Sequence, residues 1–289
     1  MDKPVIAITG AGPTGFIGSS LMQYLRGNGF TVIALNRHVT AENENAEHRF
    51  FDLEQDPSPA LLKNVQVLIH CAFISAGQHA DAEHLNFQGT KKLIEYARRN
   101  GVVKIIFFSS VSAHDKAQSA YGRSKFRSEE LFDLKKDAIL KCSMVIGNGG
   151  IFERLRKYIQ SKKIVPLMNG GKQPLQVIAL ADVQKVVLTI ISGNQSGSFI
   201  LANRQQCNYK EFFKVIARHE NRSPVFLSFP LSLLKILVGT ATFFGIKLPV
   251  NKENLLGLAA LRYFDPESSL QQLQLNPLSM EEALIDTDA

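Results

Sequence analysis

A tyrosine and a lysine stand four residues apart in the segment Tyr121-Gly-Arg-Ser-Lys125. In a helix this spacing places both side chains on one face, one turn apart. Ser110, the second residue of a serine pair, ends an apolar segment eleven residues before Tyr121. A phenol, an ammonium group and a hydroxyl that lie together can move a proton to or from an oxygen atom of a substrate. We therefore regard Ser110, Tyr121 and Lys125 as candidate catalytic residues.

Hydride transfer to or from a carbinol carbon requires such a proton movement on the attached oxygen. Tyrosine can carry the proton if the pKa of its phenol falls from about 10 toward neutrality. A fall of ~3 units corresponds to about 4 kcal/mol of preferential stabilisation of the phenolate. We expect Lys125, the positive charge of an oxidised nicotinamide and a hydrogen bond from Ser110 to supply it together. A second pair with the same spacing, Tyr158 and Lys162, follows a glycine-rich loop instead of a strand that ends in serines, so the context favours Tyr121.

The N-terminal stretch from Val5 to Arg26 predicts the element that would bind the cofactor. Four apolar residues indicate a buried strand, several glycines indicate a tight turn, and residues 19–26 begin an apolar-striped helix. Glycines at such a turn let the backbone approach a pyrophosphate, and the N-terminus of the helix offers N–H groups and the positive end of its dipole. A dinucleotide site is therefore favoured over a glycine-rich turn that binds nothing.

The rest of the chain alternates strands and helices in the way that a parallel sheet requires. Apolar runs predict strands over 30–35, 49–53, 65–72, 102–108 and 138–146, helices over 81–100 and 151–162, and, further on, a strand over 199–203 and a helix over 209–220. We expect an α/β protein with a Rossmann-type doubly wound parallel sheet and a smaller C-terminal α/β substrate domain. The expected boundaries are 1–170 for the nucleotide domain, with 175–193 packed back on it, and 195–289 for the substrate domain.

The end of the second predicted strand indicates which dinucleotide is bound. It carries Asn36-Arg37-His38, at the point where such folds meet the adenosine ribose. An acidic residue there would accept hydrogen bonds from a 2′-hydroxyl, whereas Arg37 would pair with a 2′-phosphate. We therefore expect NADP, with NAD as the alternative if Arg37 is only a surface residue.

Several motifs resemble the extended short-chain dehydrogenase/reductases of the NAD(P)-dependent epimerase/dehydratase family. They are the glycines at positions 12, 15 and 18, the run from Thr9 to Gly18 with Gly12-Pro13 as an insertion, Asn86-Phe-Gln-Gly-Thr90, and Tyr121-Gly-Arg-Ser-Lys125. The resemblance implies that Ser110, Tyr121 and Lys125 are catalytic, that Asn86 supports the active site, and that Lys125 also contacts the nicotinamide ribose. It further implies a set of cofactor contacts, with Asp52 on the adenine: Gly10, Gly12, Gly15, Phe16, Ile17, Gly18, Asp52, Leu53 and Ala72.

Whether Gly10 or Gly12 first contacts the pyrophosphate stays open. Two pairs of residues depart from the family pattern. His114-Asp115 replaces Tyr-Gly, and Lys141-Cys142 replaces Arg-Pro.

The closing segment 265–284 resembles that of family members that modify nucleotide-activated sugars. The resemblance implies a nucleotide sugar as substrate and chemistry at its C4, and Arg37 favours net reduction of a 4-keto group, because an epimerase recycles its cofactor. The apolar stretch 226–248 keeps open a dehydrogenase or reductase of steroid-like or other apolar alcohols and ketones. A catalytically idle NADP-binding sensor or scaffold is a third hypothesis. The family also suggests a homodimer formed by the helices that begin near Asp81 and Tyr121.

Composition argues against several other classes of protein. The 33 Lys and Arg against 26 Asp and Glu give a net charge of +7, but the basic residues are dispersed in pairs and no nucleic-acid-binding motif is present. The three cysteines and seven histidines lack ligand spacing, which predicts no metal site and a reducing compartment. The uncharged run of 11 residues within 226–248 is too short to span a bilayer. With no secretory signal visible, we expect a cytoplasmic protein.

Overall fold

The computed structural model describes residues 3–39, 47–75, 77, 79, 81–193, 195–233 and 252–287 of the chain. Most of the apolar stretch 226–248 therefore lies outside the described residues, and its predicted role stays a prediction. None of the helices in the described ranges combines the length and the apolar character that crossing a membrane requires.

The core of the molecule is a seven-stranded parallel sheet. Its strands are β1 (Ile6–Thr9), β2 (Val32–Asn36), β3 (His48–Phe50), β4 (Val67–His70), β5 (Lys104–Ser110), β6 (Ala138–Cys142) and β11 (Gly197–Leu201). The strand order is β11-β6-β5-β4-β1-β2-β3, and every neighbouring pair is parallel. The order reverses between β1 and β4, which is the switch point of a doubly wound fold. The predicted fold class is confirmed.

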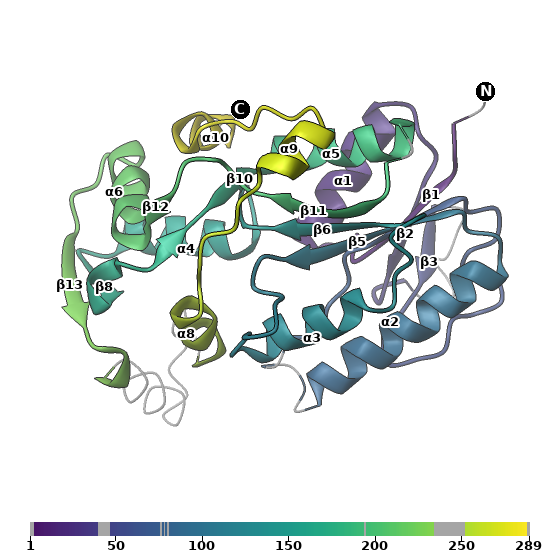
Figure 1. Ribbon diagram of the computed structural model, residues 1–289, viewed down its shortest axis with the longest axis horizontal. Helices are drawn as coiled ribbons and strands as arrows, with labels where there is room; N and C mark the ends of the chain where they lie inside the picture. The colour runs from purple at the N-terminus through teal and green to yellow at the C-terminus, as the bar shows by residue number, and fades with distance from the viewer. Residues whose placement is uncertain are drawn as a thin grey trace.

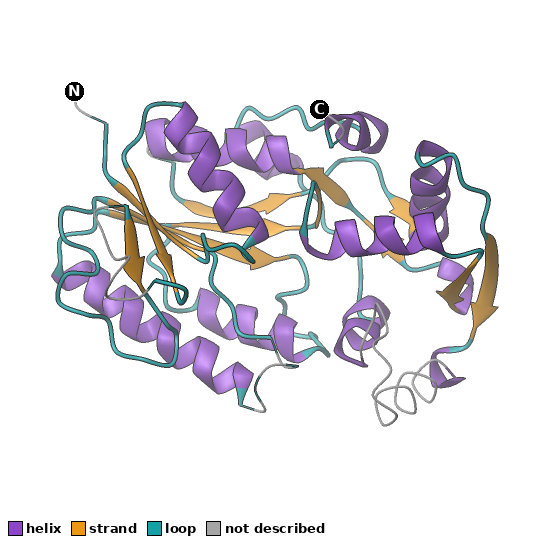
Figure 2. Ribbon diagram, turned by 180° about the vertical axis from the view of Figure 1, so that it is seen from behind, coloured by secondary structure: helices purple, strands orange, loops and turns teal. Residues whose placement is uncertain are grey.

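Helices cover both faces of this sheet, as Figures 1 and 2 show. One face packs on α1 (Phe16–Gly27), α5 (Leu180–Gly193) and α9 (Glu267–Gln272), and the other on α2 (Ala82–Arg99) and α3 (Ala120–Glu129). β1, β4 and β5 are buried along their whole length. Continuous burial explains why their sequences are almost uniformly apolar instead of alternating. Their carboxyl ends meet at one edge of the sheet, and the candidate site residues follow that edge.

A second lobe lies beyond the carboxyl ends of the sheet strands (Figure 1). It contains α4 (Gly150–Ser161), α6 (Tyr209–His219), α8 (Lys252–Ala259), α10 (Met280–Asp286), the 3-10 turn η1 (Asn169–Gly171) and the short strands β7 (Met144–Ile146), β8 (Ile164–Met168), β9 (Pro174–Leu175), β10 (Val177–Ala179), β12 (Cys207–Asn208) and β13 (Val225–Phe229). The short strands form the two-stranded sheets β10-β7, β12-β9 and β13-β8. A separate hydrophobic cluster, with Phe152 and Phe212 at its centre, holds α4, α6 and α10 together.

Two segments differ from the sequence-based expectation. The prediction of a single strand over 138–146 is wrong, because this segment divides at Ser143 into β6 of the main sheet and β7 of the second lobe. The N–H of Ser143 donates to the carbonyl of Leu201 at 2.9 Å, while β7 pairs with β10 instead of β5. The strand expected at 199–203 forms as β11, and it joins the main sheet beside β6. The chain thus leaves the sheet after β6 and returns to it with β11.

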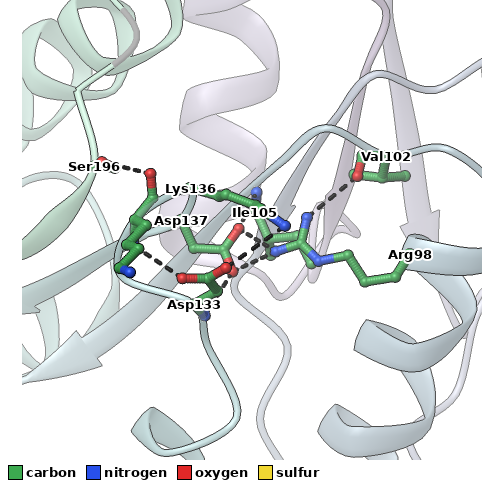
Figure 3. Close-up of polar contacts among 8 residues, drawn as sticks. Arg98, Val102, Ile105, Asp133, Lys136, Asp137 and Ser196 are labelled. Atoms are coloured by element: carbon green, nitrogen blue, oxygen red, sulfur yellow. Dashed lines mark hydrogen bonds and ion pairs between the residues drawn. The ribbon is translucent and has the colours of Figure 1, made fainter.

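A buried carboxylate fixes the opposite, amino-terminal edge of the sheet (Figure 3). Asp137 is fully buried just before β6, and both of its oxygens accept from the guanidinium of Arg98 on α2. It also accepts from the N–H of Ile105 on β5 and the N–H of Asp133, each at 3.0 Å. One side chain therefore connects α2, β5 and the turn before β6.

Candidate active site and cofactor site

The glycine turn between β1 and α1 folds back on its own backbone. Gly10 is in the left-handed region with φ +69°, and a Cβ there would lie 3.1 Å from the backbone nitrogen of Ala72. A Cβ on Gly15 would lie 1.7 Å from the carbonyl oxygen of Gly10, and one on Gly18 would lie 2.4 Å from it. These glycines are required by packing inside the turn, so the spacing that suggests a cofactor motif is also a condition for the fold.

Helix α1 begins directly at this turn. No described side chain caps its N-terminal residue Gly15, while the hydroxyl of Ser19 donates to the carbonyl of Gly12 at 2.6 Å. The uncapped first turn leaves backbone N–H groups for an anionic ligand. The ring of Phe16 lies against the backbone of Gly147, Gly149 and Gly150, and its expected contact with the cofactor stays a prediction. The glycine-rich loop after β7 is therefore a surface on which Phe16 packs.

A cavity of about 580 Å³ opens beside the turn at the end of β2, where the adenosine ribose was expected. Asn36, His38 and His48 contribute to its lining, and the side-chain oxygen of Asn36 accepts the N–H of His38 at 3.0 Å. Arg37 is exposed at the same strand end. At the strand end where a carboxylate would recognise a 2′-hydroxyl, this chain has the amide of Asn36.

Asp52 and Leu53 follow β3 in a turn in which the carboxylate of Asp52 accepts the N–H of Glu54 at 3.1 Å. Leu53 is buried, and a Cβ on Gly89 of α2 would lie 2.3 Å from its carbonyl oxygen. The glycine of the Asn86-to-Thr90 motif therefore allows α2 to pack closely on the segment after β3. The expected contact of Asp52 with adenine stays a prediction.

Asn86 is buried and holds the loop that follows β4. Its side-chain oxygen accepts the N–H of Ile74 at 2.8 Å, and its amide donates to the carbonyl of Ile74 at 2.8 Å and to that of Ala82 at 2.7 Å. Both backbone groups of one loop residue are thus fixed by one side chain. Asn86 therefore shapes this loop, which carries Ala72 and Phe73, and its expected support of an active site stays a prediction.

A buried hydrogen-bonded chain behind the turn was not predicted from the sequence. The hydroxyl of Thr9 accepts the N–H groups of Cys71 and Ala72, each at 3.0 Å, and lies 2.8 Å from Nδ1 of His70. Thr9 must therefore donate its own proton to Nδ1, which leaves Nε2 to donate to the hydroxyl of Thr90 at 3.0 Å. Burial lowers the pKa of His70 to about 3, with a smaller contribution from the charge of Lys125, so the ring is neutral. The sequence contained no signal for this chain, because its residues are far apart and each is common in a core.

Tyr121 and Lys125 both contact the ring of Phe73, and Ser110 stands at the carboxyl end of β5 beside Tyr121. The phenol of Tyr121 hydrogen bonds with the hydroxyl of Ser110, and its ring meets the ring of Phe73 edge-on at 4.9 Å between centroids. Lys125 is only 4% exposed, and its ammonium group donates to the carbonyl of Phe108 at 2.7 Å. The loop after β4 therefore connects the glycine turn, through Ala72, to the tyrosine, through Phe73.

The chain without coenzyme does not produce the lowering of the pKa of the Tyr121 phenol toward neutrality that the sequence had led us to expect. Desolvation of its hydroxyl raises the pKa of Tyr121 to about 12, although the residue as a whole is 39% exposed; Cys142 also raises this pKa, and the hydrogen bond with Ser110 lowers it. Burial also lowers the pKa of Lys125 to about 8, against the opposing effects of Cys71, Cys142 and Glu129. Because its ammonium is directed to a backbone carbonyl between aromatic rings, Lys125 does not offset the desolvation of the phenol.

The loop 111–119 and the start of α3 fix where Tyr121 stands. The side chain of Ser119 caps α3 by accepting the N–H of Gly122 at 3.1 Å, and a Cβ on Gly122 would lie 2.4 Å from the carbonyl oxygen of Ser112. His114, in the pair that departs from the family pattern, is buried against Phe264 at 5.9 Å between ring centroids. Its neighbour Asp115 lies 3.6 Å from the guanidinium of Arg262. The departing pair thus joins this loop to the C-terminal segment.

The second tyrosine–lysine pair lies elsewhere, since Tyr158 on α4 packs into the cluster of the second lobe. Lys162 follows α4 and is exposed. The structure therefore brings Tyr121, and not Tyr158, to the edge of the sheet where the cofactor motif begins.

Comparison with known proteins gives a family and several relatives. The model of the NAD dependent epimerase/dehydratase family matches residues 6–199. Sterol-4-alpha-carboxylate 3-dehydrogenase, decarboxylating, of Mus musculus is 36% identical over 107 residues, which are 35% of this chain and 29% of the mouse protein. UDP-glucuronic acid decarboxylase 4 of Arabidopsis thaliana is 21% identical over 255 residues, with 75% of this chain and 58% of the plant protein covered.

Among solved structures, UDP-glucuronic acid 4-epimerase from Bacillus cereus, in complex with UDP-glucuronic acid and NAD, superposes with a TM-score of 0.72. The match covers 98% of this chain and 97% of the epimerase, at 17% sequence identity. At that level of identity the likeness is one of fold.

Proposed function

Because the chain belongs to the NAD dependent epimerase/dehydratase family, we propose that it is an NADP-dependent oxidoreductase in which Ser110, Tyr121 and Lys125 carry out the proton transfer. The observation that carries the proposal is the grouping of these three side chains one loop away from the glycine turn. Phe73 contacts Tyr121, and the neighbouring Ala72 lies against Gly10. A dinucleotide on the turn would thus have its reactive end directed toward the phenol.

The glycine turn fits the dinucleotide. Gly15 and Gly18 let the start of α1 pack against the carbonyl of Gly10, and the first turn of α1, which has no side-chain cap, would offer its N–H groups to a pyrophosphate. NADPH, when bound, supplies the hydride. Lys125 would bind the nicotinamide ribose and hold a positive charge near the reacting oxygen, and Ser110 would hold that oxygen and the phenol in hydrogen-bonding range.

The charge state of Tyr121 supports reduction of a ketone over oxidation of an alcohol. A phenol whose pKa is raised to about 12 is protonated at neutral pH and can donate its proton to the oxygen of a carbonyl that accepts a hydride. Oxidation would need the phenolate, and so the additional positive charge of the oxidised nicotinamide. We therefore favour net reduction.

Arg37 and Asn36 support NADP over NAD. A guanidinium pairs with a 2′-phosphate through two parallel hydrogen bonds, and none of residues 36–39, which the structure describes at the end of β2, carries a carboxylate. We expect Arg37→Ala to raise KM for NADPH roughly tenfold while leaving KM for NADH almost unchanged. Equal effects on the two coenzymes would contradict this preference, and Arg154→Ala, on the surface of α4, is the matched control.

A nucleotide-activated sugar, reduced at C4, is the proposed substrate. The UDP-glucuronic acid named for the Arabidopsis and Bacillus relatives supports this class. A steroid-like ring alcohol or ketone is the second candidate, and the 36% identity with the mouse sterol dehydrogenase over 107 residues favours it. The expected homodimer and cytoplasmic location remain predictions.

The test is an assay of NADPH oxidation against a panel of 4-keto nucleotide sugars, with 3-keto steroids as a parallel panel. Consumption of NADPH with a nucleotide sugar supports the proposal. Interconversion of UDP-hexoses with a tightly held coenzyme and no NADPH consumption would contradict reduction. Turnover of the steroids alone would establish the second candidate instead.

A further inference from the structure

A partly buried ion pair lies behind the candidate catalytic residues. The ammonium of Lys141 on β6 is 2.8 Å from a carboxylate oxygen of Glu129 on α3, and the two side chains are 16% and 14% exposed. The hydroxyl of Ser109 on β5 donates to the other oxygen of the same carboxylate. Lys141 also donates to the carbonyl of Ala113 at 2.7 Å. Four segments of chain therefore meet at two charged groups.

Each of these segments carries or adjoins a candidate catalytic residue. Ser109 pairs in register with Lys141 and immediately precedes Ser110. Ala113 lies in the loop that leads from Ser110 to Tyr121. Glu129 follows Lys125 by one helical turn and Tyr121 by two, on the same face of α3. The ion pair consequently fixes the distance and rotation of α3 relative to the end of β5.

We propose that Glu129 and Lys141 are positioning residues, which hold α3 and the Ser110 loop in the geometry that lets Ser110, Tyr121 and Lys125 act together. The inference rests on the proposed oxidoreductase function. It gives a role to Lys141, the residue in which the chain departs from the Arg-Pro of the family pattern. A charged pair with two additional hydrogen bonds specifies one arrangement more strictly than apolar packing does.

Glu129 also affects the charge of Lys125. Groups that face Lys125 are His70 on β4, Cys71 after it, Cys142 on β6, and Tyr121 and Glu129 on its own helix. Burial lowers the pKa of Lys125 to about 8, and Cys71, Cys142 and Glu129 oppose that fall. If Glu129 is neutralised, one opposing group is lost, so Lys125 must lose its proton at a lower pH.

Three variants test the proposal in the full chain. Glu129→Gln keeps an acceptor for Ser109 but removes the charge, Lys141→Met keeps the stem but removes the ammonium, and Lys141→Arg keeps the charge. Lys92→Met is the matched control, because it breaks an exposed pair in which Lys92 and Asp56 are 2.6 Å apart. Thermal unfolding of each variant, with NADPH binding by fluorescence titration, establishes that the protein is folded and binds coenzyme.

We expect Glu129→Gln and Lys141→Met to lower kcat about 10- to 100-fold with little change in KM for NADPH, since a misplacement of about 1 Å has an effect of this size. Lys141→Arg should recover most of the loss, and Lys92→Met should behave as wild type. In Glu129→Gln the alkaline fall in kcat should begin at a lower pH. Wild-type kcat and an unchanged pH profile in both charge-removing variants would overturn the proposal.

A second measurement does not need turnover. The ε-carbon of Lys125, labelled with carbon-13 and assigned with Lys125→Arg, reports its titration by NMR. The proposal expects this titration at lower pH in Glu129→Gln and an unshifted one in Lys92→Met, and identical curves would overturn it. If the wild type reduces no member of the substrate panel, the proposed function fails, and the NMR titration still decides whether Glu129 controls Lys125.

Discussion

Desolvation shifts the pKa values of Tyr121 and Lys125 in opposite directions. It raises that of the phenol to about 12 and lowers that of the ammonium to about 8, because it favours the uncharged form of each group; Lys125 is 4% exposed, whereas Tyr121 as a whole residue is 39% exposed. The tyrosine therefore keeps its proton, and the lysine is charged only below about pH 8. Any shift of the phenol toward neutrality must come with the bound coenzyme.

His70 provides a prediction of stability at the same scale. Its pKa falls from 6.5 to about 3 in the folded chain, so between these values the unfolded state binds more protons. Stability must then decrease as pH falls below about 6.5, by up to about 1.4 kcal/mol per pH unit from this residue. His70→Gln should be less stable than wild type at neutral pH because it breaks the Thr9–His70–Thr90 chain.

We expect the difference in unfolding free energy between wild type and His70→Gln to narrow from about pH 6 to about pH 4.5, as measured by urea unfolding. A difference that stays constant over this range would show that His70 is not held neutral.

The candidate catalytic residues could be predicted because their chemistry dictates a short spacing. Tyr121 and Lys125 must share a helix face, and Ser110 must end a strand, so three local patterns identify the set. The Thr9–His70–Thr90 chain and the Ser109–Glu129–Lys141 cluster could not be predicted in this way. Their members come from different elements, and only the packing of α2 and α3 on the sheet brings them together.

Among the elements, the turn between β1 and α1 allows the sharpest comparison. A Cβ on Gly18 would lie 2.4 Å from the carbonyl oxygen of Gly10, whereas one on Gly27, at the other end of α1, meets no atom of the described chain within 4 Å. Gly18→Ala should therefore weaken NADPH binding roughly 100-fold. Gly27→Ala should bind normally and gain up to about 1 kcal/mol of stability from helix propensity. Calorimetric titration with NADPH checks both, and normal binding by Gly18→Ala would contradict the proposed cradle.

The periodicity of the sequence located the regular elements because strands and helices differ in where their apolar residues fall. It failed at residues 138–146, where one apolar run serves two sheets. The sequences of β6 and β7 are alike in being mostly apolar, although β7 is fully buried only at Ile146, and the pairing partners, β5 for one and β10 for the other, distinguish the two strands.

At the scale of the whole molecule, the second lobe is built from two parts of the chain, one between β6 and β11 and one after β11. The chain leaves after β6, forms β7, α4 and β8 to β10, returns through α5 to β11 beside β6, and then adds β12, α6, β13, α8 and α10 to the lobe. The predicted boundary between the two domains, at residues 170–195, stays a prediction. Any boundary must place α4 with the cluster of the second lobe and β11 with the main sheet. Local sequence patterns do not predict that the chain returns to the main sheet in this way.

The rigidity of the sheet depends on Asp137 at the edge opposite the candidate site. Asp137→Ala leaves Arg98 without its buried partner and removes the acceptor for Ile105, so it should cost about 3–5 kcal/mol of unfolding free energy. Asp133→Ala is the control, because it removes a carboxylate whose contacts, an ion pair with Lys136 and the N–H of Lys135, lie at the surface, so it should cost less than Asp137→Ala. Urea unfolding measures both, and equal losses would show that the buried cluster adds nothing beyond a surface ion pair.

The central claim is that Tyr121 donates the proton in a coenzyme-dependent reduction, and Tyr121→Phe tests it most directly. The variant keeps the ring against Phe73 and removes only the hydroxyl. With the best substrate of the panel, we predict a loss of kcat of about 100-fold or more, with NADPH binding unchanged. Turnover at the wild-type rate would contradict the account and favour an NADP-binding protein whose tyrosine has no chemical role.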